Sequence, residues 1–313
     1  MTAEPEGAPP PEAPAPPARW SERDPALAAV TYAAAYLTLA AAGGRLAELL
    51  RSPLPQALLV AALGLGCTVL SLLLVLSVCR VRIARWAQVG LFVLTTVVCL
   101  VARPEVTAAL AQWWHLPQQV SAHIPAGFPG DTLIGNLALI LWATLIGRQV
   151  ARIVRDANLL LPVAVVASLA DIITVFWGFV AHATRTAPTV VAALSVRVPV
   201  AEVPPAAQFL VLTYIGIGDF LFLAIFLTAA LRHRMRAAAA MWAAFVAMVV
   251  AAPLVDLSAY GLPGLPFISA GVVWVNRRFF RFSAEEKRAL AVVGGLLVAL
   301  IGAAVVVLLR RHR

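Results

Sequence analysis

The sequence predicts an all-α polytopic membrane protein, a bundle of eight or nine transmembrane helices. Of its 313 residues, 62% are hydrophobic and only 12% are charged, about half the charged fraction of a typical soluble domain. Its mean hydropathy is +0.90. The apolar residues also fall into stretches of about 20, the length that a helix needs to cross a bilayer. These features exclude a secreted disulfide-rich domain and a soluble nucleic-acid-binding protein.

The first 25 residues form a separate segment that is rich in proline and acidic residues. Such a segment cannot bury enough apolar surface to fold, so we expect a disordered tail over 1–25. It lacks the basic start and apolar core of a signal peptide. A passive tail is favoured over a partner-binding segment.

Nine apolar stretches follow, of which the first is interrupted by Gly43 and Gly44 and the eighth is short. The predicted spans are 26–43, 56–79, 86–102, 132–147, 159–181, 206–231, 237–255, 262–276 and 289–309. A cytoplasmic N-terminus places sixteen of the 24 basic residues inside and eight outside, in agreement with the positive-inside rule. The C-terminal Arg-Arg-His-Arg is the exception. We expect a bacterial inner membrane, with the N-terminus in the cytoplasm.

Two long connections lie on the predicted outer side. Residues 103–130 contain Trp113, Trp114 and His115, and aromatic residues of this kind favour an interfacial segment. Around 189–200 the chain is β-branched and bounded by prolines, which predicts an extended segment or strand. The chain has no P-loop, HExxH, CxxC or GxSxG motif, so we expect neither a metal nor a cofactor.

Two aspartates lie in the middle of predicted spans, Asp171 in the fifth and Asp219 in the sixth, while Asp256 lies near a span end. A charge at the bilayer centre costs at least about 2.5–3.5 kcal/mol, so such residues usually face a polar cavity and have a function. Each aspartate lies about 12 residues from the inner end of its span, roughly 18 Å at the helical rise. Consecutive spans are usually neighbours, so we expect the two carboxylates to face each other.

A facing pair of carboxylates is suited to general acid–base chemistry. Two carboxylates a few ångströms apart cannot both ionise cheaply, so they share one proton. The ionised member can deprotonate a water while the protonated member polarises a carbonyl, as in aspartic proteases. The carboxylates alone are also compatible with a proton relay or ion site in a transporter, and with a structural residue hydrogen-bonded to a neighbouring helix.

The residues around Asp219 narrow these alternatives. Residues 216–219 are Gly-Ile-Gly-Asp, and residues 262–267, two spans later, are Leu-Pro-Gly-Leu-Pro-Phe. With Asp171 on the preceding span, they resemble the motifs of the GxGD intramembrane aspartyl proteases, the family of presenilin and signal peptide peptidase. The resemblance covers roughly 159–276 and implies a presenilin-like catalytic core there, in a bacterial-type relative.

The resemblance implies catalytic and substrate-binding roles for the motif residues. The implied catalytic residues are Asp171 and Asp219, and the implied substrate-binding residues are Gly216, Gly218, Pro263, Gly264, Leu265 and Pro266. Glycines leave room for a substrate backbone, and prolines interrupt helical hydrogen bonding, which at membrane depth requires a neighbouring cavity. Two positions depart from the family pattern: Ala170 replaces a tyrosine, and Gly264 replaces the alanine of the PAL motif, a small-for-small change.

The rest of the chain carries no motif of this family. We expect an N-terminal transmembrane region over 26–158, and a basic loop with a C-terminal transmembrane helix over 277–313. The last span is atypical of the family, and its Gly294, Gly295 and Gly302 are interpreted as helix-packing residues.

The expected function is therefore that of an aspartic endopeptidase, which cleaves transmembrane helices of protein substrates within the lipid bilayer through an Asp-Asp dyad. A substrate helix must unwind first, and the segment near 189–200 could pair with it as an added strand. The orientation is similar to that of signal peptide peptidase. The alternatives are a proton-coupled transporter and an inactive relative that binds membrane helices. A prepilin peptidase is disfavoured because no lysine follows Asp219.

Overall fold

The computed structural model describes residues 24–48, 52–103, 131–176, 194–197, 214–255 and 263–288, with isolated residues between 182 and 191 and between 291 and 302. Three predicted features lie outside these residues: nearly all of the acidic tail, the interfacial segment with its tryptophans, and Asp256.

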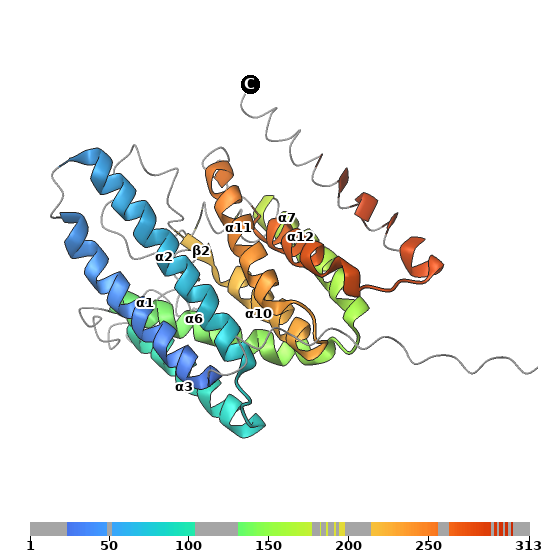
Figure 1. The fold of residues 1–313 in the computed structure, drawn as a ribbon, viewed down its shortest axis with the longest axis horizontal. Coiled ribbons are helices and arrows are strands. Elements are labelled where there is room, and N and C mark those ends of the chain that lie inside the picture. Colours follow the sequence, from blue (N-terminus) through green and yellow to red (C-terminus); the bar gives the residue numbers. More distant parts are fainter. Residues whose placement is uncertain are drawn as a thin grey trace, which may run out of the picture.

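Helices dominate the described part of the chain and lie together as a bundle (Figure 1). They are α1 (Pro25–Glu48), α2 (Pro53–Arg80), α3 (Arg85–Ala102), α6 (Asp131–Val150), α7 (Leu160–Phe176), α10 (Ile217–Arg232), α11 (Ala237–Val255) and α12 (Leu265–Asn276). Short 3-10 turns, η2 (Ala151–Ile153) and η3 (Ala157–Leu159), connect α6 to α7, and η5 (Arg277–Phe279) follows α12.

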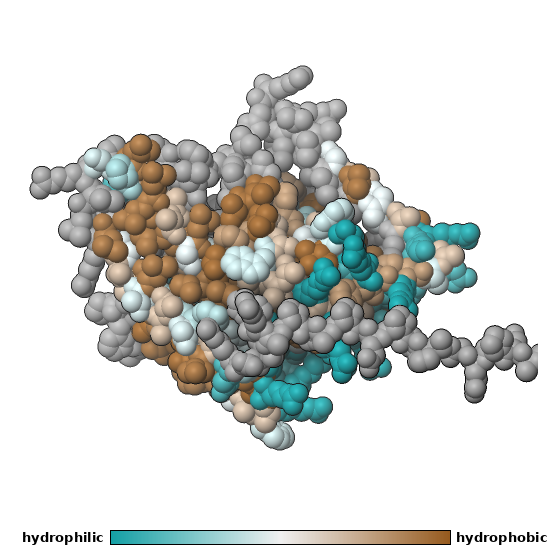
Figure 2. Space-filling view, in the orientation of Figure 1, coloured by the Kyte–Doolittle hydropathy of each residue, from teal (hydrophilic) through white to brown (hydrophobic). Residues whose placement is uncertain are grey.

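The composition of these helices identifies an integral membrane protein. Five described segments are long and apolar enough to cross a membrane: 25–43, 54–80, 85–102, 133–153 and 157–176. Apolar residues cover much of the face seen in Figure 2, and hydrophilic residues gather toward its lower right edge. The predicted all-α membrane fold is confirmed.

Two predicted spans begin later than expected. The helix predicted at 206–231 starts at Ile217, because Gly216 is extended (φ −62°, ψ 142°) and belongs to a strand. The helix predicted at 262–276 starts at Leu265, followed by Pro266 in its first turn, where the missing amide hydrogen of proline costs nothing. Both helices are consequently short, with 16 and 12 residues.

Helix α10 is the centre of the bundle and contacts α2, α6 and α11. Most of it is buried, as expected for a helix that is apolar all round; Phe220, Leu223 and Phe226 are among its fully buried side chains. Gly147 allows the close approach of α6, because a Cβ there would lie 2.5 Å from the carbonyl oxygen of Leu221. Helix α7 packs against α12, which in turn packs against α11.

Two short strands, β1 (Ser195–Arg197) and β2 (Tyr214–Gly216), pair in antiparallel fashion. Ser195 lies opposite Gly216 and Val196 opposite Ile215. The predicted extended segment near 189–200 is confirmed for β1, although residue 191 is helical. Strand β2 differs from the prediction, which places its residues in the sixth span.

The described residues of the C-terminal segment are helical between 284 and 302. They stand away from the other helices in Figure 1. A Cβ added at Gly294, Gly295 or Gly302 would have no described atom within 4 Å. The interpretation of these glycines as packing residues is therefore wrong for contacts within the described part of the chain.

Candidate active site

Asp171 lies on α7, the seventeen-residue helix in which it is the only charged residue. Its carboxylate is half-buried. Oδ2 accepts a hydrogen bond of 2.9 Å from the backbone N–H of Leu265, and the backbone of Gly264 also interacts with this carboxylate. The first amides of a helix have no partner within the helix and carry partial positive charge. The start of α12 thus supplies such an amide to Asp171.

Asp219 lies in the first turn of α10, directly after strand β2. Its carboxylate lies between two glycines from different parts of the chain. A Cβ added at Gly216 would lie 3.5 Å from Oδ2, an ordinary contact, whereas one at Gly264 would lie 3.0 Å from Oδ1. The backbone of Gly264 (φ −82°, ψ −32°) suits any residue. An alanine at position 264 would therefore require the Asp219 carboxylate or the loop to shift by a few tenths of an ångström.

The two carboxylates meet at the start of α12. Asp171 accepts a hydrogen bond from the N–H of Leu265, and the carboxylate of Asp219 lies against Gly264. Each also lies within the electrostatic reach of the other. Both aspartates can be placed by counting from the basic end of the bundle, where α7 begins and α10 ends. Asp171 lies eleven residues after Leu160, the first residue of α7, and Asp219 lies thirteen residues before Arg232, the last residue of α10. At 1.5 Å per residue, both lie about 16–20 Å from the basic end of the bundle, as the equal-depth prediction requires.

The other predicted substrate-binding residues surround this pair unevenly. Pro263 is buried and Pro266 is half-buried at the start of α12. A Cβ at Gly218 would meet no described atom within 4 Å. No neighbour in the described structure therefore requires a glycine at position 218, and the space beside it is open.

Strand β2 turns its outer edge at Gly216 toward Asp219. The N–H of Ile217 donates to the carbonyl of Leu194 at 3.1 Å, so the alternation of an antiparallel ladder turns the N–H and C=O of Gly216 away from β1. The same alternation turns the carbonyl of Ser195 away from β2. That carbonyl accepts a hydrogen bond of 3.1 Å from Nη1 of Arg103. One outer edge of the sheet is therefore occupied at Ser195, and the edge at Gly216 faces Asp219, with whose side chain its backbone interacts.

Arg103 is a candidate site residue that the sequence did not reveal. The sequence pattern places it in an outer loop, yet its side chain is only 2% exposed. Gly135 at the start of α6 provides the space, since a Cβ there would lie 2.5 Å from Cγ of Arg103. Through Ser195, which pairs with Gly216, Arg103 is linked to the strand that leads into Asp219. No motif in the sequence pairs position 103 with position 135.

An apolar groove of about 390 Å³ lies along α7, whose residues line most of it together with Phe222 of α10. It extends from Ile153 and Val154 to Ala170, the residue directly before Asp171. Ala170 is exposed. The small side chain at this position leaves room that the tyrosine of the resembled family would fill.

Among the residues that the structure describes, no group of three or more His, Cys, Asp or Glu side chains could hold a metal ion. Comparison of the chain with protein-family models, with curated proteins and with solved structures returned no match.

Proposed function

We propose that this protein is an intramembrane aspartyl protease of the GxGD type, a bacterial-type relative of presenilin and signal peptide peptidase. The proposal includes a presenilin-like core over 159–276, eight or nine spans and a cytoplasmic N-terminus. One observation carries it: Asp171 and Asp219, from two helices, meet at the Gly264–Leu265 loop at the start of a third helix.

The reaction needs only a water and the two carboxylates. The ionised carboxylate takes a proton from the water, whose oxygen attacks the carbonyl carbon of the scissile peptide bond. The protonated carboxyl group keeps its proton and donates a hydrogen bond to the carbonyl oxygen, which becomes negative as the tetrahedral intermediate forms. The C–N bond then breaks, the amine leaves with a proton from the dyad, and the pair again shares one proton.

The surroundings of the dyad suit a transmembrane helix as substrate. The peptide groups of a substrate helix are hydrogen-bonded within the helix, so the helix must unwind near the bond that is cleaved. The alternation of the β1–β2 ladder turns the backbone N–H and C=O of Tyr214 outward, so they can pair with the unwound segment as an added strand, which would bring the substrate backbone toward Asp219. The apolar groove that ends at Ala170 offers a surface for the part of the substrate that stays helical.

The deciding experiment uses a photoreactive hydroxyethylene probe, which mimics the tetrahedral intermediate and requires no known substrate. We expect labelling of the wild-type protein in membranes and none of Asp171→Ala or Asp219→Ala. Asp24→Ala, which changes an exposed aspartate at the start of α1, is the matched control and keeps the label. The protease proposal is refuted if the wild type is not labelled, or if neither mutation changes the labelling. Proton flux through reconstituted vesicles would then test the transporter alternative.

A further inference from the structure

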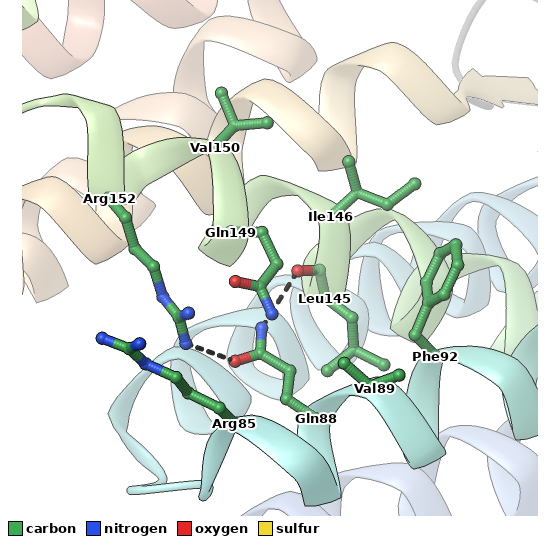
Figure 3. A pocket seen from close by; sticks show the side chains of 9 residues that line it. All are labelled: Arg85, Gln88, Val89, Phe92, Leu145, Ile146, Gln149, Val150 and Arg152. Atoms are coloured by element: carbon green, nitrogen blue, oxygen red, sulfur yellow. Dashed lines mark hydrogen bonds between the residues drawn. The ribbon is translucent and has the colours of Figure 1, made fainter.

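A second cavity, of about 460 Å³, lies between α3 and the end of α6 (Figure 3). Its volume is within the range of about 300–1,000 Å³ that is typical of ligand pockets. The nine residues that line it include two arginines and two glutamines but no carboxylate. None of them belongs to the proposed active site.

Two polar side chains of this cavity, Gln88 and Arg152, are held in place by hydrogen bonds. Gln88 is only 1% exposed, and its Nε2 donates to the carbonyl of Leu145 at 3.2 Å. Its Oε1 accepts a hydrogen bond of 3.0 Å from Nη2 of Arg152. This bond orients the guanidinium group but uses only one of its five N–H donors. Figure 3 shows Arg85 beside Arg152 at the same end of the cavity.

The cavity is cationic at one end and apolar at the other, along the axis of α3. Arg85 is the first residue of α3, and the apolar Phe92, seven residues later, lies about 10 Å deeper. Val89, also on the wall, is 49% exposed, and the adjoining Trp86 is 85% exposed. An exposed tryptophan at the polar end of a span is typical of the membrane interface. The cationic end therefore lies at headgroup depth, and the apolar end lies among acyl chains.

We propose that the cavity between α3 and α6 binds an anionic phospholipid. Its phosphodiester lies between Arg85 and Arg152, where guanidinium groups can donate paired hydrogen bonds to phosphate oxygens. One acyl chain lies along Val89 and Phe92. Basic pockets between transmembrane helices are suited to acidic headgroups, and two cations without a lining carboxylate disfavour the positive choline group of a zwitterionic lipid. This inference does not depend on the proposed protease activity.

The test is native mass spectrometry of the full-length protein in detergent, with dioleoyl phosphatidylglycerol, dioleoyl phosphatidylcholine or inorganic phosphate added separately. We expect the wild type to retain phosphatidylglycerol in preference to phosphatidylcholine. The double variant Arg85→Gln/Arg152→Gln should bind it at least about tenfold more weakly. The control is Arg155→Gln/Arg278→Gln, which removes the same charge from two exposed arginines outside the cavity and should bind as the wild type does.

A third variant separates the possible ligands and keeps every charge. Val89→Trp fills the apolar part of the cavity, so it should weaken phosphatidylglycerol binding while both arginines remain. If the control double variant loses as much phosphatidylglycerol binding as Arg85→Gln/Arg152→Gln, the attraction is unspecific and the proposal is overturned. Binding of inorganic phosphate that matches the lipid, with no effect of Val89→Trp, would identify a phosphate site and would overturn it as well.

Discussion

Gly264→Ala tests the geometry of the proposed dyad most directly. The added methyl group would lie 3.0 Å from Oδ1 and 3.4 Å from Oδ2 of Asp219, so the carboxylate or the loop must move by a few tenths of an ångström. A misplacement of about 1 Å can cost about 100-fold in rate. We therefore expect kcat to fall by about three- to tenfold. The resembled family, which has alanine in this motif, would instead lead one to expect no loss.

The assay is cleavage of a transmembrane peptide by purified protein in vesicles, with the midpoint of thermal unfolding measured in parallel. Gly90→Ala on α3 is the matched control, because a Cβ there would meet nothing within 4 Å. The midpoint of Gly90→Ala should not fall, since position 90 is inside α3, where alanine is the better helix former. Gly264 is the N-cap of α12, where glycine is preferred to alanine, so the midpoint of Gly264→Ala should fall slightly, and kcat is compared at a temperature where both variants are folded. A Gly264→Ala protein that cleaves at the wild-type rate would refute the placement of Asp219 against this loop.

Three further changes probe the surroundings of the dyad. Arg103→Met keeps the apolar stem of the side chain but removes its hydrogen bond to the carbonyl of Ser195, which is worth about 1.5–3 kcal/mol. Cleavage should therefore fall by about 10- to 100-fold. Unchanged cleavage would exclude a role of Arg103 in positioning the strand. Gly216→Pro retains the native φ of −62° but loses the amide that interacts with the Asp219 carboxylate. Peptide cleavage should therefore drop at least tenfold, by roughly the 1–3 kcal/mol of a lost buried hydrogen bond, whereas Gly216→Ala should remain close to wild type. Equal rates in the two variants would show that this amide does not position Asp219. Ala170→Trp fills the end of the groove. KM for a helical substrate should rise by about tenfold, the effect of roughly 1.4 kcal/mol of lost apolar contact, while labelling by the probe persists. An unchanged KM would exclude the groove as a substrate surface.

Hydropathy predicted the helices α10 and α12 but not the residues at which they begin inside the bundle. The stretch 206–231 is apolar throughout, and periodicity alone cannot separate a buried strand from a buried helix in such a run. The start of α10 at Ile217 depends instead on pairing between β2 and β1, which comes from about 20 residues earlier in the chain. The aspartates could be located from the sequence because a charge in an apolar span is conspicuous wherever the helix begins.

Arg103 shows a different limit of sequence reasoning. Counting basic residues places an arginine after an apolar span in a loop, and for most residues of this kind that assignment is sound. Burial of Arg103 depends on the absence of a side chain at Gly135 and on a carbonyl acceptor at Ser195. These two positions are distant in the sequence and belong to no shared motif, so their effect on Arg103 becomes visible only in three dimensions.

The ends of helices within the bundle also bear on the choice between proteolysis and ion transport. Broken helices at membrane depth occur in transporters too, where helix C-termini and free carbonyls hold cations. Here α10 and α12 both begin at the aspartates, and the amide of Leu265 donates to Asp171. Helix N-termini carry partial positive charge, which favours anions and disfavours a bound cation. The same charge would stabilise the negative oxygen that develops during attack on a peptide carbonyl, so this polarity favours the proposed hydrolysis over a cation site.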